Sequence, residues 1–124
     1  MAQTIQQQRA KFALEAVEAD RIRLSPKEQS EYRSYASELP AMIHMNGLGQ
    51  TAAFYKSKGG TRDKLYQLLS RWLTGNGQPY QQWDDLLKGI TQADQQAYRL
   101  AQTEAMALMD WVKKFAKAFM EGDA

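Results

Sequence analysis

The chain has 124 residues, of which 44% are hydrophobic and 24% are charged, and its formal net charge is +2; this composition predicts one globular domain over residues 1–124 rather than a disordered chain. The absence of cysteine and the single histidine, His44, exclude a disulfide framework, a thiol nucleophile and a zinc site of the usual composition. Because it has neither a long apolar span nor the apolar core of a secretory signal, we expect a cytoplasmic protein.

Hydrophobic residues recur at helical spacing in the N-terminal third of the chain. They predict a first helix over residues 4–24. The sequence Ser25-Pro26-Lys27-Glu28 starts a second helix, because serine caps, proline fits the first helical position and glutamate reaches back to the cap. Its apolar positions are Tyr32, Tyr35, Ala36, Leu39 and Ile43. We interpret these tyrosines as core residues rather than as platforms for bases.

The stretch over residues 39–60 combines apolar residues, glycines and positive charge. Pro40 disturbs a helix from within, and Asn46-Gly47 suits the left-handed backbone at a helix end. Helical spacing resumes over residues 50–56 and stops at Gly59-Gly60. We therefore expect two short helices at a sharp angle, with the Asn46-Gly47-Leu48-Gly49-Gln50 motif shaping the fold rather than binding a ligand.

Three more helices are predicted in the C-terminal half. Thr61 is the expected cap of a helix over residues 62–73, and Gly89 the expected end of a short helix over residues 80–88. The last helix begins near Thr91, reaches about Met120, and has an apolar face that packs in the core or in part against another subunit. With no segment typical of a strand, the prediction is an all-α, compact single-domain bundle of about six helices.

Positive charge is concentrated in the middle of the chain. Residues 39–75 contain one acid, Asp63, and five basic residues, Lys56, Lys58, Arg62, Lys64 and Arg71. Such a local excess indicates an anionic partner, although a solvated face without a partner is the alternative. The segment from Lys58 to Arg62 also predicts a phosphate-binding site, because the two glycines let the backbone N–H groups turn outward and the next helix begins there.

No combination of residues predicts catalysis. His44 lies beside Ile43 and Met45, and we expect it to be packed as a structural residue. Asp84 and Asp85 are adjacent and point in different directions on a helix, which makes a poor metal clamp. We therefore expect no catalytic residues, no metal and no cofactor.

One family is identified from the central stretch and its continuation. The motifs Leu39-Pro40, Ile43, Asn46-Gly47-Leu48-Gly49-Gln50, Ala53-Phe54 and Ser57-Lys58-Gly59 resemble the small subunit of type III-B CRISPR RNA-guided effector complexes, the Cmr complexes. Further matches are Leu65-Tyr66, Trp72-Leu73, Glu104-Ala105, Trp111-Val112-Lys113 and Phe115-Ala116. The resemblance spans residues 30–118.

The resemblance implies a non-enzymatic protein of antiviral defence. Its expected partners are other Cmr subunits, copies of itself in a stacked filament, and the duplex of guide RNA and target RNA, with no membrane. The expected RNA contacts are Lys56, Lys58, Arg62 and Lys64, together with Arg71. Lys113, Lys114 and Lys117 form an alternative basic patch. The other two hypotheses are a purely structural helical scaffold without RNA contact and a small nuclease.

Overall fold

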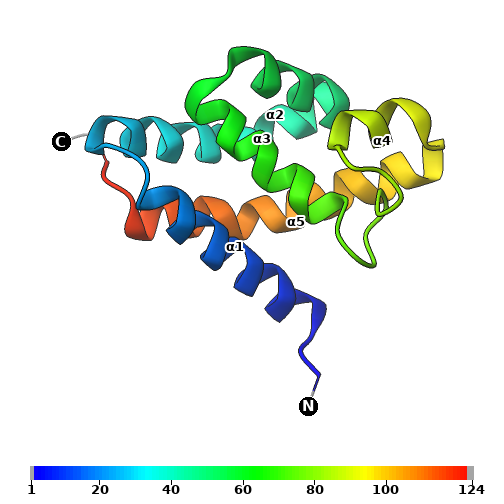
Figure 1. Cartoon of the computed structure of the whole chain (residues 1–124), viewed down its shortest axis with the longest axis horizontal. Helices are drawn as coiled ribbons and strands as arrows, with labels where there is room; N and C mark the ends of the chain where they lie inside the picture. The colour runs from blue at the N-terminus through cyan, green and yellow to red at the C-terminus, as the bar shows by residue number, and fades with distance from the viewer. Residues whose placement is uncertain (1, 123–124) are drawn as a thin grey trace.

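The computed structural model describes residues 2–122 of the chain and contains five helices and no strand within them (Figure 1). They are listed in chain order: α1 (Ile5–Arg21), α2 (Pro26–Lys58), α3 (Gly60–Leu73), α4 (Leu86–Gln92) and α5 (Gln95–Phe119). The predicted all-α class is confirmed. The helix count is five rather than about six, because α2 includes both helical pieces expected around residue 47, with the break at Gly47 between them.

Side chains cap the helices where the sequence offers serine, threonine or aspartate. Thr4 and Gln7 form a capping box at α1. Ser25 and Glu28 form the predicted box at α2, with the amide of Glu28 donating to the hydroxyl of Ser25 at 3.2 Å. These bonds satisfy amides that have no acceptor within the helix.

A break in the backbone divides α2 into two helical segments. Gly47 has φ 85° and ψ 159°, a conformation that side chains with a Cβ rarely adopt, whereas the helix continues through Pro40. The break frees amides of the second segment, and α5 satisfies them. The amide of Leu48 donates to the side chain of Gln102 at 3.0 Å, and that of Gly49 to the hydroxyl of Tyr98 at 2.9 Å. The predicted change of direction at residues 46–47 is thus confirmed.

The helix predicted over residues 80–88 is wrong in its position. Turns occupy residues 80–85, and α4 begins at Leu86. The reason is tertiary: the amide of Leu86 donates to the Ser70 hydroxyl at 3.0 Å, and the amide of Leu87 to the Tyr66 hydroxyl at 3.1 Å. Two side chains of α3 therefore act as the cap of a helix more than a dozen residues away.

Gly89 lies inside α4 instead of ending it. A Cβ at this position would be 2.5 Å from Cγ of Tyr80, so only glycine lets the buried tyrosine ring pack directly on the helix backbone.

Two other predicted boundaries also differ. Thr61 does not cap α3, because Gly59 is the N-cap residue and Thr61 is buried in the first turn. Thr91 belongs to the end of α4, so the last helix starts at Gln95 with Asp94 as its cap. At its other end Phe119 is 48% exposed.

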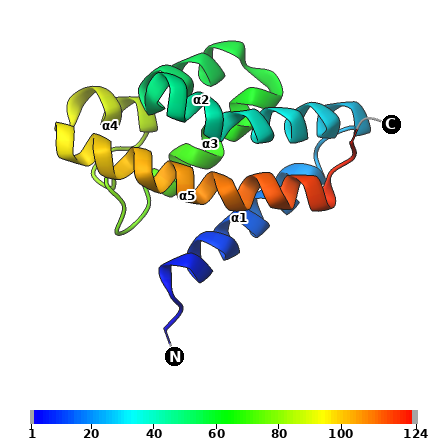
Figure 2. The same cartoon turned by 180° about the vertical axis from the view of Figure 1, so that it is seen from behind.

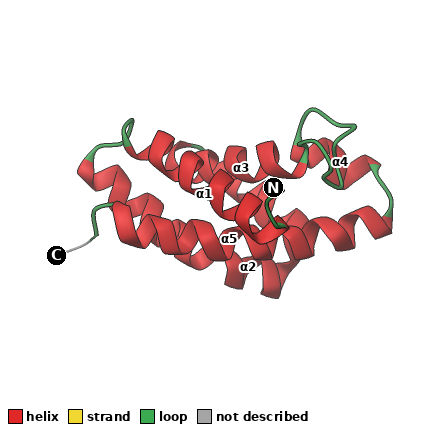
Figure 3. Ribbon diagram, turned by 90° about the horizontal axis from the view of Figure 1, so that it is seen from below, coloured by secondary structure: helices red, strands yellow, loops and turns green. Residues whose placement is uncertain are grey.

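Helix α5 is the longest uninterrupted element and supports the others. The first segment of α2 runs alongside it, while α1 crosses it and leaves its N-terminal end projecting from the body (Figures 1 and 2). Helix α3 packs mainly on α2. The loop between α3 and α4 lies at the end of the molecule away from the C-terminus (Figure 3). No helix within residues 2–122 is both long and apolar enough to cross a membrane.

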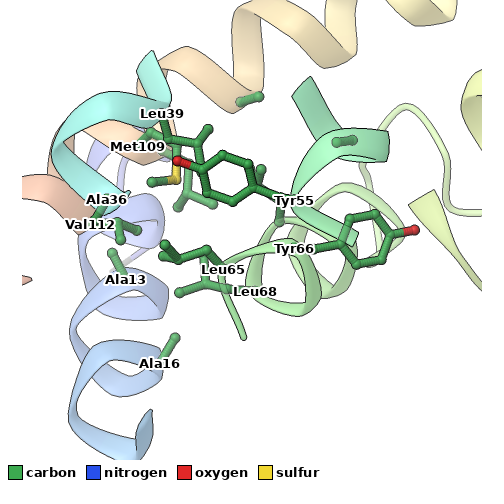
Figure 4. Close-up of a cluster of buried hydrophobic side chains, with 14 of the residues drawn as sticks. Ala13, Ala16, Ala36, Leu39, Tyr55, Leu65, Tyr66, Leu68, Met109 and Val112 are labelled. Carbon is green, nitrogen blue, oxygen red and sulfur yellow. The ribbon is translucent and has the colours of Figure 1, made fainter. Parts of the chain in front are cut away.

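The core is formed where four helices meet. Figure 4 shows Ala13 and Ala16 of α1, Leu39 of α2, Leu65 and Leu68 of α3, and Met109 and Val112 of α5 in one cluster. Except for Ala16, which is 6% exposed, these residues have no exposed surface. The core therefore holds the end of α2 and the start of α3, where all the predicted RNA contacts except Arg71 lie, in a fixed relative position.

Candidate nucleic-acid interface

The turn between α2 and α3 brings three of the five predicted RNA contacts together. Gly59 and Gly60 have φ of 66° and 56°, so the chain reverses sharply between the two helices. Nothing lies within 4 Å of the place where a Cβ would stand on either glycine. The turn therefore leaves open space beside Lys56, Lys58 and Arg62, which is compatible with the approach of a backbone phosphate.

Arg62 is held on aromatic rings rather than by a carboxylate. Its Cζ atom lies 3.9 Å from the centre of the Tyr35 ring and 5.5 Å from that of Phe54. Its Nε atom is buried and has no hydrogen-bond partner among the described residues. Since a cation–π contact orients the guanidinium without neutralising its charge, the group can still bind an anion.

The platform under Arg62 is itself fixed. The hydroxyl of Tyr55 donates to the backbone carbonyl of Tyr35 at 2.8 Å, which ties the two segments of α2 together. Burial first, and then the charge of Glu38, raise the pKa of the Tyr55 hydroxyl, so this hydroxyl remains a donor at neutral pH. The backbone of Tyr35 is therefore held by Tyr55, and its side chain packs against the core and lies under Arg62.

The two lysines of the turn differ in their partners. Lys58 is exposed, with Nζ 5.4 Å from the centre of the Phe54 ring. Lys56 pairs with Asp63 at 3.3 Å and also lies over the Tyr66 ring. The Asp63 carboxylate partly offsets the charge of Lys56, so Lys58 and Arg62 are the stronger candidates for phosphate contact.

Lys64 and Arg71 lie on another face of α3, which is turned toward α1. Arg71 helps to line a hollow of about 350 Å³ between α1 and α3, together with Phe12, Glu15, Ala16, Ala19, Asp20 and Arg23. Burial raises the pKa of Asp20; the bond from Tyr32 and the charges of Lys64, Arg71 and Arg23 lower it, but burial prevails. Acidic groups therefore oppose these two cations, and the five predicted contacts form two separate groups.

The alternative basic patch lies on the C-terminal part of α5. Lys114 and Lys117 are exposed and Lys113 is half-buried. Lys117 borders a second hollow of about 350 Å³, with Arg33, Ser30, Ser34, Ser37 and Gly122. This patch contains positive charge and hydroxyls, but no aromatic ring lines its hollow.

Comparisons with known proteins identify the family. The model of the family described as CRISPR-associated protein (Cas_Cmr5) matches residues 5–119. The chain belongs to the Cmr5 family. The resemblance to the small Cmr subunit is therefore confirmed. The family match also covers α1, which lies outside the motifs that first indicated the family.

A sequence relative and a solved structure agree with this membership. The CRISPR system Cmr subunit Cmr5 of Thermus thermophilus is 29% identical over 115 residues, which are 89% of this chain and 93% of the relative. The crystal structure of a CRISPR-associated Cmr5 family protein from the same organism has a TM-score of 0.78 and 26% identity. That comparison covers 96% of this chain and 100% of the other.

The prediction that His44 is packed as a structural residue is wrong. His44 is exposed, because the rotation of about 100° per residue in a helix turns it away from the core that buries Ile43. Asp84 pairs with Lys88 at 3.1 Å, and Asp85 accepts a hydrogen bond from Tyr66, so the two carboxylates do not converge. Within residues 2–122 no group of three His, Cys, Asp or Glu residues could hold a metal ion.

Tyr35 and Phe54 are the site residues that sequence reasoning missed. Tyr32 is fully buried, as expected, whereas Tyr35 is only partly buried and Arg62 lies over its ring. The available signal was the spacing of four between Phe54 and Lys58, which places an exposed ring and a cation on one face of a helix. The link from Tyr35 to Arg62 has no local signal, since 27 positions separate them.

Proposed function

We propose that this chain is a non-catalytic small subunit of a type III-B Cmr effector complex, acting in the cytoplasm in antiviral defence. In this proposal it helps to hold the duplex of guide RNA and target RNA through a basic surface that does not read sequence. The observation that carries the proposal is the position of Arg62 over the Tyr35 ring. Arg62 and Lys58 both lie near the Phe54 ring, and neither cation is paired to a described carboxylate.

Phosphate contact is the chemistry that these cations support best. Arginine and lysine neutralise backbone phosphates without distinguishing bases, and the resulting affinity depends on salt. Base pairing between guide and target already supplies sequence specificity in RNA-guided complexes, so a protein subunit need only recognise backbone and shape. Lys56, Lys64 and Arg71 are proposed as weaker contacts, since acidic groups lie near each of them.

Assembly with other proteins is the second part of the proposal. The name of the Thermus relative describes it as a Cmr subunit, and we propose that this chain likewise joins other Cmr subunits and stacks on copies of itself. Large hydrophobic side chains remain exposed at Ile5, Leu14, Ile22, Met45, Phe54, Leu100 and Phe119. Exposed apolar residues on several helices are compatible with more than one contact surface.

A purely structural scaffold is the alternative function. The neighbouring acids favour it, because Asp63 pairs with Lys56 and Asp20 lies near Lys64 and Arg71. If the cations serve only the fold, their removal leaves RNA binding unchanged while assembly persists.

The deciding experiment uses the reconstituted complex. We would measure its affinity for the guide–target duplex with the wild-type chain, with a Lys56, Lys58, Arg62, Lys64 quadruple alanine variant, and with a Lys113, Lys114, Lys117 triple alanine variant of similar charge loss. The size of the complex reports assembly in parallel. We expect intact assembly and weaker RNA binding for the quadruple variant alone. Equal affinity of all three complexes would favour the scaffold, and a loss confined to the triple variant would move the RNA surface to α5.

A further inference from the structure

A hollow lies at the break in α2, and the proposed contacts between the basic residues and phosphate do not use it. Its volume is about 450 Å³, and it is lined by Met42, Asn46, Gln50, Thr51 and Phe54. Met42 and Asn46 precede the break at Gly47, whereas the other three residues follow it. The positive φ of Gly47 therefore produces the hollow by setting the two segments of α2 at an angle.

One lining residue carries a polar group without a partner. Thr51 is only 2% exposed, and its hydroxyl oxygen has no hydrogen-bond partner among the described residues. Leaving a buried hydroxyl unsatisfied carries a cost in stability. A ligand that hydrogen-bonds to Thr51 would remove this cost, so the hydroxyl marks the hollow as a place for a polar group.

The remaining walls combine flat apolar surface with neutral amides. Phe54 is 37% exposed and contributes its ring to the wall, and Met42 contributes a polarisable thioether. Asn46 and Gln50 are exposed, and each amide has both donors and an acceptor. No lining residue is charged. Aromatic rings and amide side chains are what proteins use to stack on unpaired bases and to bind their edges.

Phe54 connects the hollow with the cations of the proposed RNA surface. Nζ of Lys58 lies 5.4 Å and Cζ of Arg62 lies 5.5 Å from the centre of its ring. A nucleotide whose phosphate contacts these cations therefore has its base within reach of the ring. The adjoining positive charge distinguishes this hollow from one built for a neutral side chain of a partner protein.

We propose that the hollow at the break of α2 binds an unpaired RNA base, with Phe54 stacking on it and Thr51, Asn46 and Gln50 binding its edge. This inference rests on the proposed function, because Lys58 and Arg62 hold the adjoining phosphates. It adds contacts with the base itself to a surface that otherwise contacts only the RNA backbone.

The test compares two short single-stranded RNAs of equal length and charge, one with bases and one abasic, binding to the full chain. Base stacking on one aromatic ring is worth about 1–3 kcal/mol, so we expect roughly tenfold tighter binding of the base-bearing RNA. Phe54→Ala should abolish this preference. Because the ring also contacts Lys58 and Arg62, the readout is the ratio of the two affinities and not either affinity alone. Met45→Ala is the matched control, since Met45 is 78% exposed in the same region and does not line the hollow.

Thr51→Val is a second test variant, and it leaves the Phe54 ring in place. We expect it to raise the free energy of unfolding, because an unpaired buried hydroxyl is removed, and at the same time to lower the preference for base-bearing RNA. A variant that merely damaged the fold would reduce both quantities.

Each other outcome overturns the inference. Equal affinity for the two RNAs would leave phosphate contact standing and remove the base site. Binding of neither RNA by the chain or by its reconstituted complex would remove both the base site and the proposed function. If Phe54→Ala instead weakened assembly with other Cmr subunits without changing RNA preference, the hollow would belong to a protein partner.

Discussion

The guanidinium group of Arg9 binds the carboxylate of Glu104 through two hydrogen bonds, of 2.6 and 2.8 Å. The two side chains are only 16% and 13% exposed. The indole N–H of Trp72 donates to the same carboxylate at 2.9 Å. Helices α1, α3 and α5 are therefore joined at Glu104, which explains how the projecting α1 is held against the body.

Replacing this carboxylate tests its contribution to stability. Glu104→Gln removes the charge that Arg9 pairs with and leaves part of the guanidinium unsatisfied, so we expect a loss of about 2 kcal/mol in the free energy of unfolding. The matched control is Glu18→Gln, because Glu18 and Arg21 form an exposed pair, with 39% and 40% of the Arg21 and Glu18 side chains accessible. Such a pair is worth under about 0.5 kcal/mol. Urea unfolding measures both, and equal losses would contradict this account.

The same carboxylate makes stability depend on acid. Burial raises the pKa of Glu104, but the hydrogen bonds from Arg9 and Trp72 and the charge of Arg9 outweigh it and hold the pKa below its ordinary value of 4.5. The carboxylate therefore stabilises the fold fully above pH 4.5, and this contribution is lost as the pH falls through the lower folded-state pKa.

We expect the stability difference between wild type and Glu104→Gln to shrink as the pH falls below 4.5. Urea titrations at a series of pH values measure this difference. Asp20, whose pKa burial raises, is present in both proteins and cancels from the comparison. A difference that stayed constant down to acid pH would show that Glu104 acts by packing alone.

The break in α2 gives a third prediction, with two neighbouring glycines as a matched pair. At Gly47, φ is 85° and a Cβ would lie 3.1 Å from the hydroxyl of Tyr98. Gly47→Ala should therefore cost about 1–2 kcal/mol through backbone strain and displacement of Tyr98. At Gly49 the nearest atom would be 3.4 Å away, an ordinary contact. Gly49→Ala should be neutral or stabilising, because alanine favours helix. Thermal unfolding measures the stability of both variants. An equal loss of stability in the two would contradict the claim that the backbone of Gly47 requires glycine.

Features that depend on a few adjacent residues were predictable from the sequence. The Ser25–Glu28 box and the change of direction at Gly47 follow from local backbone chemistry, and both are confirmed. The start of α4 was not predictable in this way, because the hydroxyls of Ser70 and Tyr66 select Leu86 from a distance. The burial of His44 was also mispredicted from its neighbour. Ile43 is buried, but the next residue along a helix points in a different direction, and the His44 imidazole is exposed.

The candidate site was predictable in composition and only partly in geometry. Charge counting finds Lys58 and Arg62, but it also includes Lys64 and Arg71, which face Asp20 on another side of α3. The aromatic support of Arg62 comes from Tyr35, far away in the sequence, and depends on the reversal of the chain at Gly59. Such contacts require the packed structure.

The salt dependence of RNA binding tests the central claim most directly. We would compare reconstituted complexes carrying wild type, Lys58→Ala with Arg62→Ala, or the control Lys88→Ala, which removes an exposed lysine of α4 paired with Asp84. Each lost phosphate contact reduces the slope of log affinity against log salt by about one unit, so the double variant should lose about two units and the control none. An unchanged slope for the double variant would contradict the assignment of Lys58 and Arg62 as RNA contacts.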